Sequence, residues 1–164
     1  MTPELHRPVA VERIGPAGLD LRIEATAAEC AAIAARMQVP AVLALACHFH
    51  VERDLAEQLV AHGHLMARVV QTCVVTLEEF AAPVEERFAV RFVPEGTETH
   101  DVDPEALDEV PYEGAVIDLG EAAAEQLALA LDPYPRAPNA ELPEMPQDAE
   151  SGPFGALDAL RRRH

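Results

Sequence analysis

GHLMARVVQTCVVTLEEF, residues 63–80, is the longest strand-like stretch of the 164-residue chain. Over its first half, Leu65, Ala67 and Val69 alternate with residues that point to the opposite side. A period of two residues is typical of a strand with one buried face. The alternation stops just before Cys73, so the sequence predicts a long strand that ends there.

Residues 42–52, upstream of this stretch, alternate in the same way and carry apolar side chains at the odd-numbered positions, beginning with Leu43. A turn at residues 54–57 connects the two stretches, which therefore predict an antiparallel hairpin. Opposed residues of an antiparallel pair point to the same side, so the odd-numbered residues of both strands are expected on the buried face. The polar face of the hairpin then carries four histidines: His48, His50, His62 and His64.

The N-terminal part predicts two strands and a helix. Residues 9–14 and 19–24 are short β-like runs joined by the turn-rich sequence GPAG. Thr26 followed three residues later by Glu29 predicts a capping box, in which each side chain accepts from the backbone N–H of the other residue. The helix that begins there is expected to end before Pro40.

The C-terminal part predicts one strand, one long loop and one helix. The chain is expected to turn near Pro83 and to return as an antiparallel strand over residues 86–93. Residues 94–113 are acidic and rich in turn formers, which predicts a long loop. Asp118 and Glu121 predict a second capping box, at the start of a helix with an apolar stripe.

Together these elements predict an α+β fold, an antiparallel β-sheet with two main helices packed on one face. Residues 1–135 are expected to form a single α+β domain. Residues 136–164 have the composition of a Pro-rich, acidic tail. Within that tail, residues 154–163 have the apolar spacing of a short terminal helix, and its last residues are arginines, whose charge favours a helix C-terminus.

The charge of the chain limits its partners. The chain has 29 acidic residues against 12 basic ones, all arginine, and a formal net charge of −17. Such a field repels phosphate backbones and anionic lipid, so neither DNA nor a membrane is expected as a partner. Three cysteines in no disulfide-like spacing favour a reducing compartment. With no signal-like or membrane-spanning stretch in the sequence, the chain is predicted to be cytoplasmic.

Three segments resemble one known family in their order along the chain. They are QTCVVT at residues 71–76, which contains Cys73 and Thr76, a Leu-rich and Pro-terminated phrase at residues 118–135, and FGALDALR at residues 154–161. The first resembles a Cys-x-x-Cys-type turn that follows a strand, although Thr76 replaces the second cysteine. In this combination the chain resembles a cysteine-poor member of the YceD-like family, the large ribosomal RNA subunit accumulation proteins.

The resemblance implies a role in the accumulation or processing of 23S ribosomal RNA during large-subunit assembly. It implies no chemistry, and the sequence has no Gly-rich phosphate loop, Ser-centred elbow or aromatic stacking platform, so we predict a non-catalytic factor without a cofactor. The expected partners are ribosomal RNA or large-subunit ribosomal proteins, with the acidic surface on basic proteins and arginines on RNA. The candidate binding residues are Arg68, Arg87, Arg91, Arg161, Arg162 and Arg163, with Arg22 as a further candidate.

Alternative hypotheses stay open for each group of candidate residues. The four histidines could hold a zinc-like ion or form part of a small-ligand site, or they could simply be an exposed polar strand face. Cys73 could be half of a metal-binding pair or a nucleophile, but a structural thiol is the preferred interpretation because neither a second local cysteine nor a neighbouring base is visible. The arginines could also be solvated charges that pair with acidic neighbours.

Overall fold

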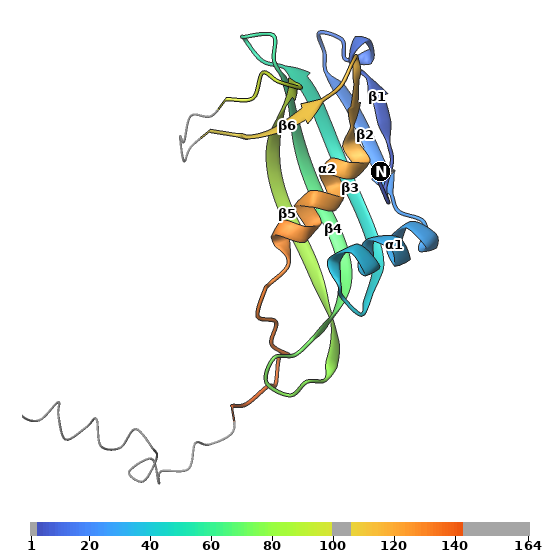
Figure 1. The fold of residues 1–164 in the computed structure, drawn as a ribbon, viewed down its shortest axis with the longest axis vertical. Coiled ribbons are helices and arrows are strands. Elements are labelled where there is room, and N and C mark those ends of the chain that lie inside the picture. The colour runs from blue at the N-terminus through green and yellow to red at the C-terminus, as the bar shows by residue number, and fades with distance from the viewer. Residues whose placement is uncertain (1–2, 100–105, 143–164) are drawn as a thin grey trace, which may run out of the picture.

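The computed structural model describes residues 3–99 and 106–142. These residues form a five-stranded sheet of order β2-β3-β4-β5-β6, a separate sheet of β1 and β7, and two α-helices (Figure 1). The predicted α+β class is confirmed. The elements are β1 (Pro8–Ala10), the 3-10 helix η1 (Val11–Arg13), β2 (Leu19–Glu24), α1 (Ala27–Met37), β3 (Ala41–Arg53), β4 (Leu59–Thr72), β5 (Glu79–Pro94), β6 (Asp108–Tyr112), β7 (Val116–Asp118) and α2 (Leu119–Ala130).

The predicted hairpin of β3 and β4 is confirmed, and so is the common polar face of its four histidines. His48 lies opposite His64, and His50 lies opposite His62. The odd-numbered residues are buried from residue 45 to residue 51 in β3 and along β4. The expectation that Leu43 is buried is wrong, because a β-bulge between residues 42 and 44 shifts the alternation by one residue and leaves Leu43 54% exposed.

The predicted strand over residues 9–14 is wrong beyond its first residues. β1 ends at Ala10, and η1 follows it. Val9 and Ile14 are both buried, whereas residues five apart on a straight strand would point to opposite faces. The turn of η1 lets both side chains reach the core. β1 also pairs with β7 and not with the main sheet, so the prediction that both N-terminal strands belong to that sheet is wrong for β1.

β5 begins at Glu79, seven residues before the predicted start. Pro83, which was expected near a turn, instead lies within the strand and pairs with Arg68 of β4. The turn that connects β4 to β5 lies immediately after Cys73. A proline is tolerated in a paired strand where its nitrogen faces away from the partner strand, and no described strand pairs with this part of β5 on its other side.

The predicted loop over residues 94–113 contains a strand, and the prediction of a wholly antiparallel sheet is therefore also wrong. β6 pairs in parallel with residues 90–94 of β5. Val110 and Tyr112 of β6 pack against the hydrophobic core, which stabilises this acidic segment at the sheet edge. Its composition alone is typical of a loop, and the packing of these two side chains decides otherwise.

The first predicted capping box is confirmed at the start of α1. The Glu29 N–H donates to Thr26 Oγ1 at 3.3 Å, and the Thr26 N–H donates to Glu29 Oε2 at 2.7 Å. At α2 only half of the prediction is right. Asp118 caps the helix by accepting from the N–H groups of residues 120 and 121, but Glu121 accepts a bond from Arg36 Nη1 at 2.7 Å instead of returning one to Asp118.

The N-terminal segment fastens the two helices together. Arg7 donates two bonds to the Glu29 carboxylate, at 2.8 and 3.0 Å, and its backbone N–H donates to Asp118 Oδ1 at 2.9 Å. The hydrogen bonds from Arg7, followed by the N–H of Thr26, lower the pKa of Glu29 to about 2. One arginine therefore connects the cap of α1 to the cap of α2.

One face of the main sheet is covered and the other is open. α1 packs against β3, and α2 packs against β4 and β5 (Figure 1). On the covered face, Leu65 and Val69 of β4 are fully buried together with Ile33 of α1 and Leu127 of α2. On the other face the even-numbered residues of β4 from 62 to 68 are exposed or only partly buried. We call this second surface the open face.

Neither helix in the described part of the chain is long and apolar enough to cross a membrane. Residues 136–142 form no helix or strand. The predicted terminal helix over residues 154–163, with Arg161, Arg162 and Arg163, lies outside the described residues. The division into a domain over residues 1–135 and a tail over residues 136–164 stays a prediction.

Candidate functional site

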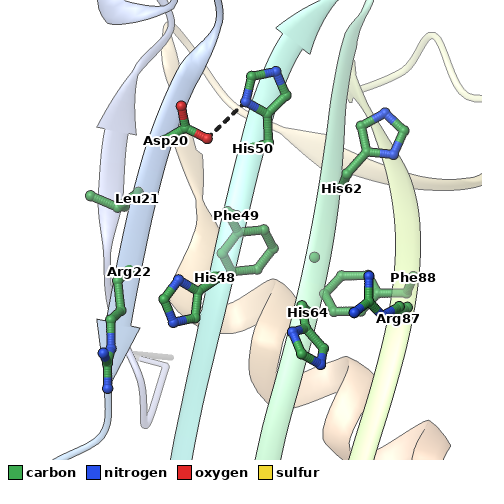
Figure 2. A pocket seen from close by; sticks show the side chains of 11 residues that line it. Asp20, Leu21, Arg22, His48, Phe49, His50, His62, His64, Arg87 and Phe88 are labelled. Atoms are coloured by element: carbon green, nitrogen blue, oxygen red, sulfur yellow. Dashed lines mark hydrogen bonds and ion pairs between the residues drawn. The ribbon is translucent and has the colours of Figure 1, made fainter.

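The open face carries a row of four basic or potentially basic residues across four adjacent strands. Arg22 of β2 lies opposite His48 of β3, His48 lies opposite His64 of β4, and His64 lies opposite Arg87 of β5. Figure 2 shows these side chains side by side on one surface of the sheet. Directly opposed residues lie about 5 Å apart at Cβ, so the row is continuous. We call these four residues the cross-strand row.

Two residues of the cross-strand row contact carboxylates. Arg22 forms an ion pair with Glu24, and His64 Nε2 lies 2.7 Å from Glu85 Oε1. No ion pair of His48 or Arg87 is found in the described part of the chain. The row therefore offers two charged guanidinium groups and two imidazoles in a protein with a net charge of −17.

The other two histidines pair with carboxylates in the neighbouring row. His50 Nδ1 lies 2.9 Å from Asp20 Oδ1 (Figure 2), and His62 Nε2 lies 3.4 Å from Glu52 Oε1. The hydrogen bond to Asp20 raises the pKa of His50 above its usual value. A proton on His50 is thus stabilised by its neighbours on the open face.

The four histidines lie together as predicted, but their rings serve different partners. His50 bonds to Asp20 and also lies 3.7 Å from Glu52, which pairs with His62 as well, whereas His64 bonds to Glu85. No three His, Cys, Asp or Glu side chains within residues 3–99 and 106–142 could hold one metal ion. The open face is hollowed between them by a depression of about 540 Å³, which Gly63 also lines. The depression is wide enough for a small ligand or for part of a polymer.

The three arginines predicted on β4 and β5 point to the open face, but they are widely spaced. Arg68 lies opposite Pro83, Arg87 opposite His64, and Arg91 opposite Val60, so each is four pairs from the next, about 13 Å along the strands. Arg91 also lies 3.7 Å from Glu109 Oε1 and is mostly buried. Arg87 is the arginine that the register places beside other basic groups. Arg68 is exposed farther along the strand.

The alignment of His48 and His64 with Arg22 and Arg87 was not predicted from the sequence. The predicted hairpin places the two histidines on one face, and the observed register sets them opposite each other. The signal that completes the row is the strand order, because β2 must lie beside β3 and β5 beside β4 for the arginines to extend it. Alternation along each strand does not contain that information.

Cys73 is buried at the end of β4, and its sulfur accepts backbone hydrogen bonds. The Ala137 N–H donates to Cys73 Sγ at 3.4 Å, and the Thr76 N–H donates to it at 3.5 Å. These bonds, that from Ala137 first, lower the pKa of the Cys73 thiol to about 7. Thr76 therefore contributes both its side chain and its backbone to the motif, and the sulfur connects the turn after β4 to the segment after α2.

We expect the Cys73 thiol to ionise near pH 7 in the folded protein and the Cys47 thiol to stay protonated, because burial raises the pKa of Cys47 to about 12. Variants that each retain a single cysteine would be titrated by the ultraviolet absorbance of the thiolate, and unfolded samples would serve as the control. Equal midpoints for the two folded variants would contradict the assigned hydrogen bonds.

The comparisons with known proteins point to one family. The sequence model described as the large ribosomal RNA subunit accumulation protein YceD matches residues 61–156, more than half of the chain. This match confirms the resemblance carried by the segments around Cys73 and after Asp118. It includes β4 to β7 and α2 and leaves out β1 to β3. No curated protein and no solved structure matches the chain.

Proposed function

Because this chain belongs to the family of the large ribosomal RNA subunit accumulation protein YceD, we propose that it is a non-catalytic factor for the accumulation and processing of 23S ribosomal RNA during assembly of the large ribosomal subunit. The family match over residues 61–156 is the observation that carries this proposal. The name of the family concerns large-subunit ribosomal RNA, and the step in assembly is our inference.

The cross-strand row supports a direct contact with RNA. Arg22 and Arg87 stand at its two ends, with His48 and His64 between them. Guanidinium and imidazolium groups bind phosphate oxygens, and such contacts position a protein without reading sequence. The rest of the surface is dominated by carboxylates, which favour basic ribosomal proteins as additional partners. In this proposal the row contacts RNA, and the acidic surface contacts protein.

The environment of the candidate nucleophile supports a non-catalytic role. Cys73 Sγ is buried, and its contacts with the N–H groups of Thr76 and Ala137 hold the chain together at this point. His64 and His50, which could act as bases, bond to Glu85 and Asp20 on the open face. A thiol nucleophile must be reached by its substrate, whereas Cys73 Sγ is fully buried and its lowered pKa comes from hydrogen bonds that hold the turn in place.

We expect cells depleted of this protein to show a lower ratio of 23S to 16S RNA, together with 23S precursors that retain unprocessed ends. Mapping of RNA ends during depletion measures both effects. A chain with Arg22→Ala and Arg87→Ala is expected to restore the ratio poorly. The matched control, Arg13→Ala with Arg53→Ala, removes two exposed arginines outside the row and is expected to restore the ratio in full. An unchanged 23S to 16S ratio after depletion would overturn the proposed function.

The same variants test the RNA contact in solution. If each arginine neutralises one phosphate, Arg22→Ala with Arg87→Ala should lower the slope of log affinity against log salt by about two. Fluorescence anisotropy with a labelled 23S fragment at several salt concentrations measures this slope. An equal slope for the row variant and the control variant would mean that the RNA contact lies elsewhere on the protein.

The depression between the histidines favours one alternative, a small metal- or ligand-binding module built on His48, His50, His62 and His64. Metal analysis of protein purified without a histidine tag separates the two functions. Stoichiometric zinc, nickel or copper that is lost in the variant His48→Ala with His64→Ala would favour the module. Retention of metal by that variant would exclude His48 and His64 as ligands.

A further inference from the structure

The outer edge of β5 is unpaired over most of its length. β4 pairs with β5 from residue 79 to residue 92 on one side, whereas β6 pairs with residues 90–94 alone on the other. Within the part of the chain that the structure describes, no strand covers residues 79–89 on that side. Figure 1 shows this lower part of β5 at the margin of the sheet. An uncovered strand edge is a template for pairing with another extended chain.

The position of Pro83 shows which main-chain groups face outward. Pro83 lies opposite Arg68 but has no N–H, so this pair cannot exchange hydrogen bonds and the Pro83 backbone points away from β4. Because backbone direction alternates along a strand, residues 81, 85, 87 and 89 also present their N–H and C=O groups to the outer edge. Pro83 interrupts the row of donors once, and three consecutive outward donors follow it.

A groove runs beside this edge on the helix side of the sheet. Phe80, Ala82 and Val84 of β5 form its apolar wall, and the end of α2 with the segment after it, including Ala130 and Pro135, forms the opposite wall. Its volume is about 310 Å³. A strand added to β5 would place every second side chain over this groove and the others over the open face. Side chains directed to the groove would therefore be partly apolar.

Carboxylates outnumber cations along the edge. Glu79 and Glu85 point to the open face, and Glu86 and Asp132 lie on the groove side. Two arginines, Arg87 on the open face and Arg136 in the groove, oppose them. The local excess of negative charge has the same sign as the net charge of −17, so an incoming strand with basic side chains is favoured on both faces.

We propose that the outer edge of β5, residues 81–89, binds an extended basic peptide as an additional strand of the sheet. The incoming strand donates to and accepts from the outward backbone groups of β5, places apolar side chains in the groove, and sets Lys or Arg beside Glu79, Glu85 and Glu86. The source of the peptide rests on the proposed function, since the basic proteins of the large subunit are the partners expected there. The site itself rests on the unpaired edge, the groove and the charge.

The test uses the full chain and a short labelled peptide in which Lys alternates with Val. Binding is followed by fluorescence anisotropy. Glu85→Gln and Glu85→Pro remove the same charge, but only the proline also removes an outward N–H. We expect Glu85→Pro to bind the peptide about fivefold more weakly than Glu85→Gln, as for the loss of one main-chain hydrogen bond. Glu12→Gln, which removes an exposed carboxylate away from this edge, is expected to bind like the natural chain.

A second peptide keeps the test decisive if Glu85→Pro fails to fold. In it, alternate residues carry an N-methyl group, which blocks pairing along one edge and leaves the charge unchanged. The natural chain is expected to bind this N-methylated peptide much more weakly than the unmethylated one. Equal affinity for both peptides would show charge attraction alone and would overturn the proposal. Binding that occurs only after deletion of residues 153–164 would assign the edge to the chain's own tail and would overturn it as well.

The peptide-binding test can fail or succeed independently of the proposed function in ribosomal RNA accumulation. A normal 23S to 16S ratio after depletion, with peptide binding intact, would overturn the proposed function and leave the edge as a peptide site of different origin. A lowered ratio with no strand-specific peptide binding would overturn this inference alone.

Discussion

Replacing Leu65 with alanine is expected to lower the free energy of unfolding by about 2–5 kcal/mol, one of the two largest effects among single substitutions considered for this protein. Leu65 is fully buried on the covered face of β4, the central strand of the sheet. Its truncation removes apolar contacts and leaves a cavity between the sheet and the helices, which the neighbouring side chains fill only in part. Urea denaturation followed by circular dichroism measures the change.

Met66→Ala is the matched control, because Met66 is the next residue of the same strand and points to the open face, where it is 38% exposed. Its truncation is expected to cost less than about 1 kcal/mol. Similar losses for Leu65→Ala and Met66→Ala would mean that the open face is covered in solution, for instance by a second copy of the chain. That result would also remove the cross-strand row from the accessible surface.

Gly120→Ala is the second substitution with a large expected effect. A Cβ atom at residue 120 would lie 2.4 Å from the backbone oxygen of Leu5 and 2.9 Å from the backbone nitrogen of Arg7. The N-terminal segment would have to move away, although Leu5 is buried in the core and Arg7 bonds to both helix caps. Overpacking of this kind costs about 1–3 kcal/mol and here outweighs the gain of about 1 kcal/mol from alanine in a helix.

Gly15→Ala provides the comparison for this substitution. A Cβ atom at residue 15 meets no atom within 4 Å, and its effect on stability is expected to be near zero. Thermal unfolding of both variants measures the difference in melting temperature. A Gly120→Ala variant as stable as the natural chain would show that the N-terminal segment does not pack against α2 as described.

The open face gives a strongly acidic protein a means of contacting RNA. The net charge of −17 describes the whole chain, but a phosphate at the surface responds mainly to charges within about a Debye length, roughly 8 Å at physiological salt. Arg22 and Arg87 lie in one row with His48 and His64, and the carboxylates nearest to the row are bonded to Arg22 and His64. Contact is therefore expected to be local and salt-sensitive, as the slope measurement tests.

Much of the sheet was predictable because β3 and β4 are long and each has one buried face. Their period-two pattern predicts the hairpin, and the face of each residue follows once both apolar sets face the core. The shared face of the four histidines was therefore available from the sequence, whereas the pairing of His48 with His64 was not, because a slip by two residues keeps the same faces. The cap of α1 was predictable for a related reason, since Thr26 and Glu29 form a local motif that depends on no distant contact.

Other parts were decided by partners far away in the chain. Three-residue strands such as β1 and β7 have too few residues for a pattern, and their pairing depends on the burial of Val9 and Ile117 in the common core. β6 has the composition of a loop and becomes a strand because Val110 and Tyr112 find the core beside β5. Pro83 predicts a turn and instead lies in a strand, since the edge beside it is uncovered.

The features of the candidate site can also be separated into those that the sequence determined and those that the tertiary structure decided. By itself the sequence determined the buried and exposed faces of the hairpin, the four-histidine surface, the Cys73 motif and the family, because each depends on residues that are near in the chain or in a recognisable order. Only the tertiary structure decided that β2 and β5 flank the hairpin, which brings Arg22 and Arg87 into line with His48 and His64 and leaves one edge of β5 unpaired. The physical reason is that side-chain period specifies a strand's faces, whereas strand order depends on how all the apolar faces pack together at once.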